Sequence, residues 1–353
     1  MQPLFCAFLF CLIAPRYPMN HFCTIFFRPR GVKPFVGNFL LQAALVLLLS
    51  AVSSSALHAQ FIPPKEPMLP YAKSGGKDMM LDIYAKDTAS AKPFPVILWL
   101  HGGTWFSGNK NGFGSNYAAS MIKYGFAVVC ANYVTTERFP AQLHNCKAAV
   151  RWIRANGSKY NLDTSKIAVW GEGAGGHLAA LLGTTGDVKT ATVGNASIDI
   201  EGNLGNNQYS SRVEAVVDLY GPTDFLKMDE QTVEECASPV MHNLPTSPEA
   251  LLLGAAITTI PDKVKAANPI SYITPDDPPF LIQHGNADCN VPFNQSELLD
   301  EALNKAGVTS TLDILDGYRH WDSGFYTPGN LRRIRNFIEQ AFAPKQTASN
   351  TQE

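Results

Sequence analysis

The chain has 353 residues, of which 46% are hydrophobic and 16% are charged, so it can bury a large core and is not disordered throughout. Its formal net charge of −2 gives no general reason to expect nucleic acid or an anionic membrane surface as a partner. This length allows one large α/β domain or two smaller ones.

The first sixty residues predict a signal for export. They contain four basic residues and no acidic residue, and a short apolar run at 39–52 leads into the small-residue stretch SSSALHAQ. This order is typical of a secretory signal peptide over 1–60, with cleavage between 56 and 60 and a periplasmic or secreted product. The alternative is a retained membrane anchor through 39–52, although a bilayer-spanning helix needs about 20 residues. The sequence offers two starts for translation, Met1 and Met19.

Cleavage would change the charge and the cysteine count. It removes four of the 28 basic residues and leaves 24 against 30 acidic ones, a net charge of −6. Four of the seven cysteines remain, and four cysteines allow three complete pairings. Cys130 and Cys146 lie in apolar or helix-like stretches and are expected to be buried thiols. Cys236 and Cys289 lie in loop-like segments and are the favoured pair for a disulfide, which an exported protein can hold.

Short apolar runs alternate with helix-like segments from residue 67 onward. Several of these runs are nearly continuous in apolar residues, as in strands that are covered on both faces of a mainly parallel sheet. Seven strands are predicted, at 80–85, 95–100, 126–133, 166–170, 213–220, 278–284 and 310–315.

The helix-like segments complete the predicted architecture. Alternation of strands and helices favours a doubly wound α/β domain with right-handed crossovers. The segments 184–211 and 223–274 break the alternation and are expected to be lid-like insertions that face a substrate. We expect one domain over 61–345 and a polar tail at 346–353. Helices are predicted at 140–156, 174–182, 296–306 and 330–341.

The stretch LHGGTWFSGNK, at 100–110, follows an apolar strand. Two adjacent glycines let the backbone approach a substrate closely, so the N–H groups of Gly102 and Gly103 are predicted donors to a developing oxyanion. An ordinary turn would also explain two glycines. His101 is interpreted as a structural residue that orients this loop.

The stretch KIAVWGEGAGGHLAALLG, at 166–183, predicts a strand, a tight turn and a helix. This is the pattern of a nucleophile elbow, whose central residue is normally Ser, Cys or Asp, but the central position here is Gly173. Glu172 is not expected to replace the nucleophile, because adjacent residues of the turn project in different directions. His177 is interpreted as a helix residue with a buried hydrogen bond. The serines at 107, 210 and 211 are interpreted as solvated loop residues.

Two further loops follow predicted strands. Asp288 lies in IQHGNADCNVPF and His320 lies in LDGYRHWDSGF. A buried carboxylate can orient a histidine and stabilise its imidazolium form. Each residue alone is a weak signal. The order of oxyanion loop, elbow, acid and histidine is that of an α/β-hydrolase.

The segment from about 71 to 341 resembles the secreted α/β-hydrolase esterases of the bifunctional feruloyl/acetyl esterase (BD-FAE-like) type, kin to the hormone-sensitive-lipase-like carboxylesterases. The matching stretches include LHGGTWFSGNK, VWGEGAGGHLAALLGTTG, DLYGPTDF and GYRHWDSGF. The elbow of that family reads G-x-S-A-G-G-H-L, so its serine falls on Gly173. The resemblance implies no cofactor. It implies an acid at Asp288, a base at His320, and oxyanion donors at Gly102, Gly103 and Ala174.

The missing hydroxyl leaves several interpretations of the function. The chain is an acetyl/feruloyl-type esterase that is impaired or inactive, either naturally or by deliberate substitution, with water activated by His320 as a slow route. The alternative is a non-catalytic protein that binds an ester or an acylated sugar. A serine peptidase of the prolyl-oligopeptidase type shares the residue order, but nothing here resembles that family's propeller domain.

The expected partner is a small-molecule ester or an acylated carbohydrate, without nucleic acid and without stable membrane insertion after cleavage. The sequence contains no metal-ligand cluster and no phosphate-binding loop. Four aromatic residues are candidates for the substrate pocket, although aromatic residues near strand ends are as often core: Trp105, Phe106, Tyr220 and Trp321.

Overall fold

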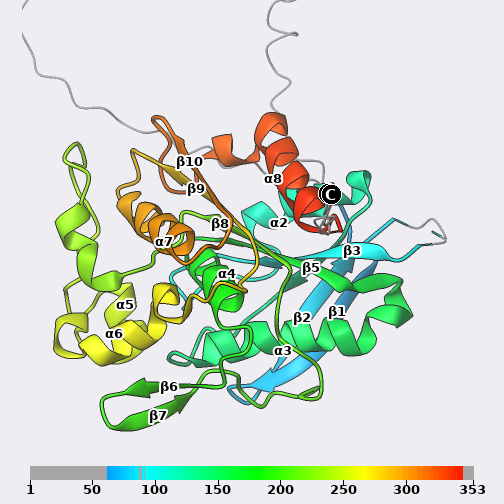
Figure 1. Cartoon of the computed structure of the whole chain (residues 1–353), viewed down its shortest axis with the longest axis horizontal. Helices are drawn as coiled ribbons and strands as arrows, with labels where there is room; N and C mark the ends of the chain where they lie inside the picture. Colours follow the sequence, from blue (N-terminus) through cyan, green and yellow to red (C-terminus); the bar gives the residue numbers. More distant parts are fainter. Residues whose placement is uncertain (1–61, 87–89, 91, 345–353) are drawn as a thin grey trace, which may run out of the picture. The chain divides into compact units, whose positions relative to one another are not determined.

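An eight-stranded sheet forms the centre of the structure (Figure 1). The computed structural model describes residues 62–86, 90 and 92–344, so the predicted signal peptide and polar tail lie outside the described residues. The strand order is β1-β2-β4-β3-β5-β8-β9-β10. The strands are β1 (Glu66–Ser74), β2 (Lys77–Tyr84), β3 (Phe94–Leu100), β4 (Ala127–Ala131), β5 (Leu162–Glu172), β8 (Ala215–Leu219), β9 (Phe280–Gly285) and β10 (Ser310–Leu315).

The direction of the strands determines where the loops meet. β1, β2 and β4 pair antiparallel, whereas β4 through β10 pair parallel along the sheet. Leu100 at the end of β3 pairs with Gly171 of β5, and Glu172 at the end of β5 pairs with Leu219 of β8. The loops that follow these three strands therefore leave the same edge of the sheet, next to the point where the strand order reverses. Such a switch point is where open α/β sheets bind ligands.

Helices cover both faces of the sheet, as the continuous apolar strands predict. Helices α3 (Ala141–Asn156), α4 (Ala174–Thr184) and α7 (Asn294–Lys305) contribute to the core on one face, and α2 (Phe113–Ala119) and α8 (Pro328–Ala341) contribute to the core on the other. β3 serves both cores, because Leu98 packs into the first and Trp99 into the second. The doubly wound α/β-hydrolase fold predicted from the sequence is confirmed.

Some elements were not predicted. β1 lies at the edge of the sheet, and its burial pattern is mixed rather than continuously apolar. α2 and α6 (Pro261–Ala267) have only seven residues each, too few for a clear helical period. α5 (Pro248–Leu253) falls within the helix-like stretch SPEALLLGA of the second insertion.

The insertion at 184–211 differs from the expectation of a substrate-facing lid. It contains a two-stranded hairpin, β6 (Thr190–Val193) and β7 (Ala196–Asp199), which contacts α6 (Figure 1). Lys147 and Arg151 of α3 both form ion pairs with Glu201, so the insertion is fastened to the side of the domain. Its residues line none of the three cavities around Gly173 that are described below. Ser211 is buried and donates to Glu201, so interpreting it as a solvated serine was wrong.

Among the described residues, no helix has the length and apolar character needed to cross a membrane.

Candidate active site

Gly173 occupies the turn between β5 and α4 with φ +53° and ψ −115°. Residues with a side chain rarely adopt a positive φ, and strained conformations of this kind gather at functional sites. A Cβ on Gly171 would lie 2.0 Å from the carbonyl oxygen of Gly175, so the turn closes only because these positions are small. The chain therefore builds a nucleophile elbow around a residue without a side chain.

His320 faces the position that a side chain at 173 would occupy. A Cβ built on Gly173 would lie 3.3 Å from His320 Nε2 and 3.9 Å from Tyr220 Cε2. The other ring nitrogen of His320, Nδ1, lies 2.6 Å from Asp288 Oδ2. The structure thus brings together the three positions that the sequence assigned to nucleophile, base and acid.

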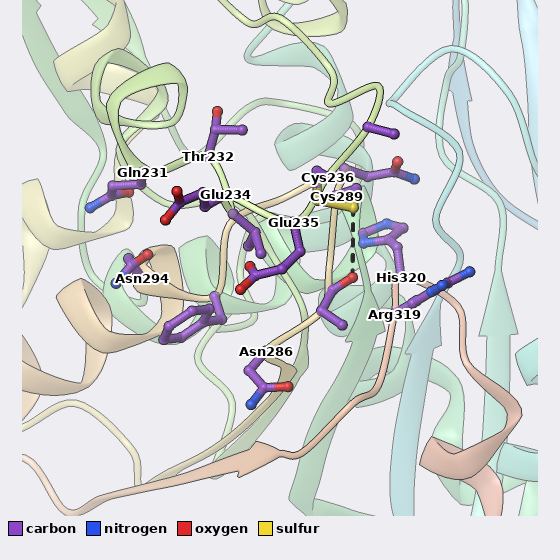
Figure 2. Close-up of a pocket in the computed structure, with 15 residues that line it drawn as sticks. Gln231, Thr232, Glu234, Glu235, Cys236, Asn286, Cys289, Asn294, Arg319 and His320 are labelled. Atoms are coloured by element: carbon purple, nitrogen blue, oxygen red, sulfur yellow. Dashed lines mark hydrogen bonds between the residues drawn. A yellow bond between two sulfur atoms is a disulfide. The ribbon is translucent and has the colours of Figure 1, made fainter.

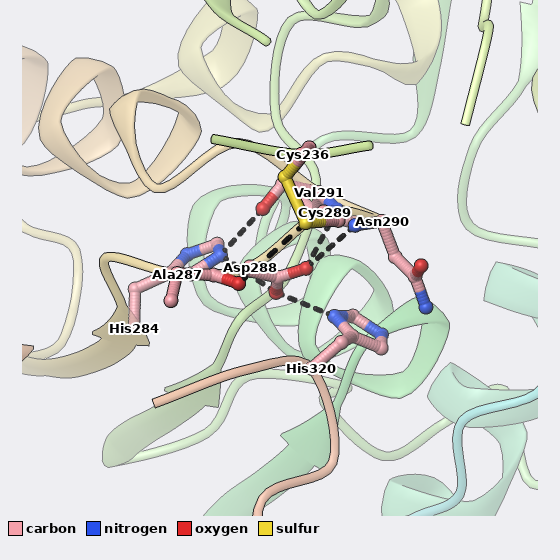
Figure 3. The surroundings of a disulfide bond; sticks show 8 residues. All are labelled: Cys236, His284, Ala287, Asp288, Cys289, Asn290, Val291 and His320. Carbon is pink, nitrogen blue, oxygen red and sulfur yellow. Dashed lines mark hydrogen bonds and ion pairs between the residues drawn. A yellow bond between two sulfur atoms is a disulfide. The ribbon is translucent and has the colours of Figure 1, made fainter. Parts of the chain in front are cut away.

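Asp288 is held as a carboxylate by several donors (Figure 3). Its Oδ1 accepts from the backbone N–H groups of Asn290 and Val291, and its Oδ2 contacts His320 and, at 3.2 Å, His284 Nε2. Burial alone would raise the pKa of Asp288, but the hydrogen bonds from His284 and His320 outweigh it and hold the pKa well below its usual range. The group is therefore charged at neutral pH and suited to orienting an imidazole. His284 was missed from the sequence, since it lies inside β9 and reads as a strand residue.

The oxyanion loop reaches the same cavity as Gly173. Gly103 has φ +109°, and Gly103 and Ala174 both line a cavity of about 80 Å³ together with Gly173 and His320. The N–H of Ala174 is at the first turn of α4, where backbone donors lack helical acceptors. Within the described residues, neither Gly103 N–H nor Ala174 N–H has a hydrogen-bond acceptor. Gly102 lies beside the elbow, because a Cβ on it would be 2.9 Å from the carbonyl oxygen of Glu172.

Two other histidines have the structural positions that were predicted for them. His101 stacks on Tyr133 with ring centroids 4.1 Å apart, and burial lowers its pKa to about 4. His177 is fully buried and contacts the carbonyl oxygen of Ala267 at 2.7 Å. Its Nδ1 accepts from the indole of Trp105 at 3.2 Å, which fixes the end of the oxyanion loop.

The four aromatic candidates divide into two groups. Trp105 and Trp321 line the cavity at Gly173, and Trp321 remains half exposed. Phe106 instead packs against the hydrophobic core. Tyr220 is fully buried, its ring centroid is 4.6 Å from that of His320, and its hydroxyl donates to Glu172. The assignment of Tyr220 and Phe106 to a substrate pocket is therefore corrected: Tyr220 packs against the ring of His320, and Phe106 is a partly buried residue that packs against the core.

Glu172 points away from the nucleophile position. Its Oε2 accepts from Tyr326 at 2.7 Å and from Tyr220 at 3.2 Å, toward α2 and α8. Burial raises the pKa of Glu172 to about 7, against the opposing effect of these hydrogen bonds. The buried carboxyl of Asp218 likewise has a pKa raised to about 7, mainly by burial.

These two raised pKa values predict that the stability of the fold depends on pH. In the unfolded chain the Glu172 carboxyl titrates near its ordinary pKa of 4.5, whereas in the folded chain it holds its proton up to about pH 7. The contribution of Glu172 to the free energy of unfolding is therefore fully present below about pH 4.5. It is lost as the pH rises to about 7, which lowers the free energy of unfolding by roughly 3 kcal/mol. Urea unfolding between pH 4.5 and 8 should show the free energy of unfolding falling as the pH rises. Glu172→Gln should remove the part of this pH dependence that Glu172 causes and leave the part that Asp218 causes. A Glu172→Gln profile that parallels the natural one would contradict the assignment.

A disulfide joins Cys236 and Cys289, the pair that the sequence favoured (Figure 3). Cys130 and Cys146 are free and buried. Cys289 directly follows Asp288, and its carbonyl oxygen accepts from the N–H of Val240. The second insertion is thus fastened to the loop that carries the acid.

We expect reduction of this disulfide to loosen the second insertion and the acid loop. The closed loop spans 53 residues, so the cross-link is expected to stabilise the fold by up to about 4 kcal/mol. A Cys236→Ser/Cys289→Ser variant should lose that stability in urea unfolding, and its backbone amides at 231–240 should exchange hydrogen faster. An oxidised sample with four titratable thiols would contradict the pairing.

A larger cavity of about 870 Å³, lined by both polar and apolar groups, opens on the other side of His320 (Figure 2). The segment 231–237 forms one wall, and the acid loop with the start of α7 forms the other. Its labelled side chains are mainly amides and charged groups, including Glu234, Glu235, Asn286 and Arg319 (Figure 2). A third cavity, of about 470 Å³, lies beside the oxyanion loop and is lined by Glu172 and Trp321 among others.

The described residues contain no group of three or more His, Cys, Asp or Glu side chains that could hold a metal ion. Sequence reasoning also missed His242 and Glu249 in the second insertion, which line the cavity at Gly173. No motif marks them, and only the tertiary structure brings them to the elbow.

Comparison with known proteins agrees with this geometry. The BD-FAE family model matches residues 81–303, more than half of the chain. The chain belongs to the BD-FAE family. A truncated carbohydrate esterase from gut microbiota is 35% identical to this BD-FAE chain, with a TM-score of 0.70 over 78% of this chain and 95% of that one. A thermophilic esterase from Thermogutta terrifontis shares the fold at 24% identity, with a TM-score of 0.60 over 80% of this chain and 96% of that one.

Two esterases of Mycobacterium tuberculosis are also similar to this BD-FAE chain. LipC is 28% identical over 253 residues, which cover 68% of this chain and 58% of LipC. LipQ is 29% identical over 245 residues, which cover 69% of this chain and 53% of LipQ. The match thus spans little more than half the length of these relatives. The chain therefore belongs to a family with an α/β-hydrolase fold, and the relatives named here are esterases.

Proposed function

We propose that this chain binds carboxylic esters of the acetyl or feruloyl type at Gly173 and hydrolyses them slowly at most. The single observation that carries this proposal is the placement of His320. Its Nε2 lies 3.3 Å from the position of a Cβ at 173, while its Nδ1 is held 2.6 Å from Asp288. That arrangement serves a serine nucleophile, and the residue at 173 has no hydroxyl.

Without a serine oxygen no acyl-enzyme forms. A water molecule beside Gly173 would give a proton to His320 Nε2 as its oxygen adds to the ester carbonyl. The N–H groups of Gly103 and Ala174 would stabilise the oxyanion, and the proton would then pass to the departing alcohol oxygen. A site that lacks one member of a catalytic triad still accelerates such reactions by roughly 10³- to 10⁴-fold over water.

The cavity of about 870 Å³ beside His320, with its mixed polar and apolar lining, supports an acylated carbohydrate as the ester. Its amide and charged side chains offer many hydrogen-bonding groups, and Phe293 is an aromatic residue of the same lining. A hydroxyl-rich alcohol fits such a lining better than a long apolar one.

The test of the proposed function is to restore the nucleophile. The Gly173→Ser variant should hydrolyse a short-chain aryl acetate and methyl ferulate, and the natural chain should not do so at ordinary esterase rates. A variant without activity would favour the alternative, a non-catalytic ester- or acylated-sugar-binding protein. Ordinary rates in the natural chain would reveal another nucleophile. The expected result is the same whether the serine was lost naturally or was replaced deliberately by Gly173 in an active esterase.

We propose in addition that the mature chain is exported. The basic flank, the apolar run at 39–52 and the small residues that follow support a cleaved signal, with a retained anchor as the alternative. The disulfide between Cys236 and Cys289 supports an oxidising compartment.

A further inference from the structure

A second histidine–carboxylate pair lines the cavity at Gly173. His242 and Glu249 are each 3% exposed, and His242 Nδ1 lies 3.1 Å from Glu249 Oε2. Both residues come from the second insertion, and they share the cavity wall with Gly173 and His320. The Asp288–His320 pair, by contrast, comes from the loops after β9 and β10.

The pair lacks the hydrogen bonds that buried polar groups normally have. Within the described residues, His242 Nδ1 and Glu249 Oε2 are buried and have only each other, at 3.1 Å, and neither atom has a further hydrogen-bond partner. Leaving an imidazole and a carboxyl buried without hydrogen bonds is costly, and such groups in native proteins call for an explanation. An ion pair that served only the fold would be expected to satisfy these atoms.

The surroundings hold the pair in place. Asp229 accepts from the backbone N–H groups of His242 and Asn243, at 2.6 and 3.0 Å, which fixes the loop before α5. Ser247 caps α5 by accepting from the N–H of Ala250, which fixes the turn that carries Glu249. The imidazole and the carboxyl are therefore positioned by their own backbone, before any ligand arrives.

We propose that His242 and Glu249 bind a hydroxyl group next to the ester bond of the ligand. A hydroxyl can donate to a neutral imidazole nitrogen or accept from a protonated one, and it can donate to the carboxylate. Gly173 and His320 line the same cavity as the pair, so a hydroxyl bound by His242 and Glu249 would lie close to the reacting carbonyl. The ligand class is the monoester of a vicinal diol, and this inference rests on the proposed ester-binding function.

The test compares two ligands that differ by one hydroxyl. Calorimetric titration of the natural chain with trans-1,2-cyclohexanediol monoacetate should give a dissociation constant at least about tenfold below that for cyclohexyl acetate, because hydrogen bonds to charged groups are the stronger kind. Equal affinities, or no binding of the diol ester, would overturn the proposal. This comparison needs no variant and no turnover, so it is separate from the activity of Gly173→Ser.

Variants distinguish a binding role from a structural one. Glu249→Gln and His242→Phe should each bring the ratio of the two dissociation constants, cyclohexyl acetate over diol ester, down toward one. Leu251→Ala is the matched control, because it changes an exposed side chain of α5 and leaves both side chains of the pair and their backbone contacts in place, so the preference should stay unchanged. If one of the pair variants folds and keeps the full preference, the proposal is wrong.

Discussion

The Gly173→Ser variant is expected to hydrolyse a short-chain aryl acetate at least about a thousandfold faster than the natural chain. The gain arises because the added Oγ would lie next to His320 Nε2, which is 3.3 Å from the Cβ position. His320 can then take the serine proton while Asp288 stabilises the imidazolium. Initial rates at matched enzyme concentration, with a burst of alcohol release as the sign of an acyl-enzyme, would measure the gain.

The same substitution is expected to lower the free energy of unfolding. Position 173 has φ +53°, which glycine adopts freely and serine does not, so the cost is about 1–3 kcal/mol. Gly173→Ala is the matched control, since it should have the same loss of stability in urea unfolding and no gain in rate. An alanine variant as active as the serine variant would show that the hydroxyl is not the nucleophile.

Asp288→Asn, made in the Gly173→Ser background, is expected to lower kcat by about 10⁴-fold. The amide oxygen of the asparagine can still accept from the N–H groups of Asn290 and Val291, as Asp288 Oδ1 does now. Its amide N–H₂ would then face His320 Nδ1, where a carboxylate oxygen now lies at 2.6 Å. The imidazole would be held in the tautomer that cannot take the serine proton.

A control separates this effect from a general loosening of the acid loop. Asn286→Ala lies in the same loop and removes the side chain that bonds to Asp316 and Gly317, without touching His320. Its kcat on the aryl acetate, which has no sugar to occupy the cavity that Asn286 lines, should stay within a few-fold of the parent. If Asp288→Asn loses no more activity than this control, the aspartate does not orient the histidine.

The main elements of the fold were predictable because their signals are local. The apolar runs of β3, β5 and β9 and the helical period of α3 are visible within six to sixteen residues. The edge strand β1 and the β6–β7 hairpin carry weak patterns, because one side of each stays exposed or half-buried. Short helices such as α2 and α6 depend on packing more than on their own sequence.

The sequence by itself determined the elbow, the order of acid and histidine, and the absence of a hydroxyl at Gly173. Each of these depends on a short motif or on a single residue type. Only the tertiary structure shows the remaining contacts. Tyr220 packs against His320, and His284 is a second partner of Asp288. His242 and Glu249 line the cavity at Gly173. Tyr220 and His320 follow different strands, and the second insertion is distant in sequence from the elbow, so these distances in space are set by how the sheet brings its strand ends together and how the insertion packs over them.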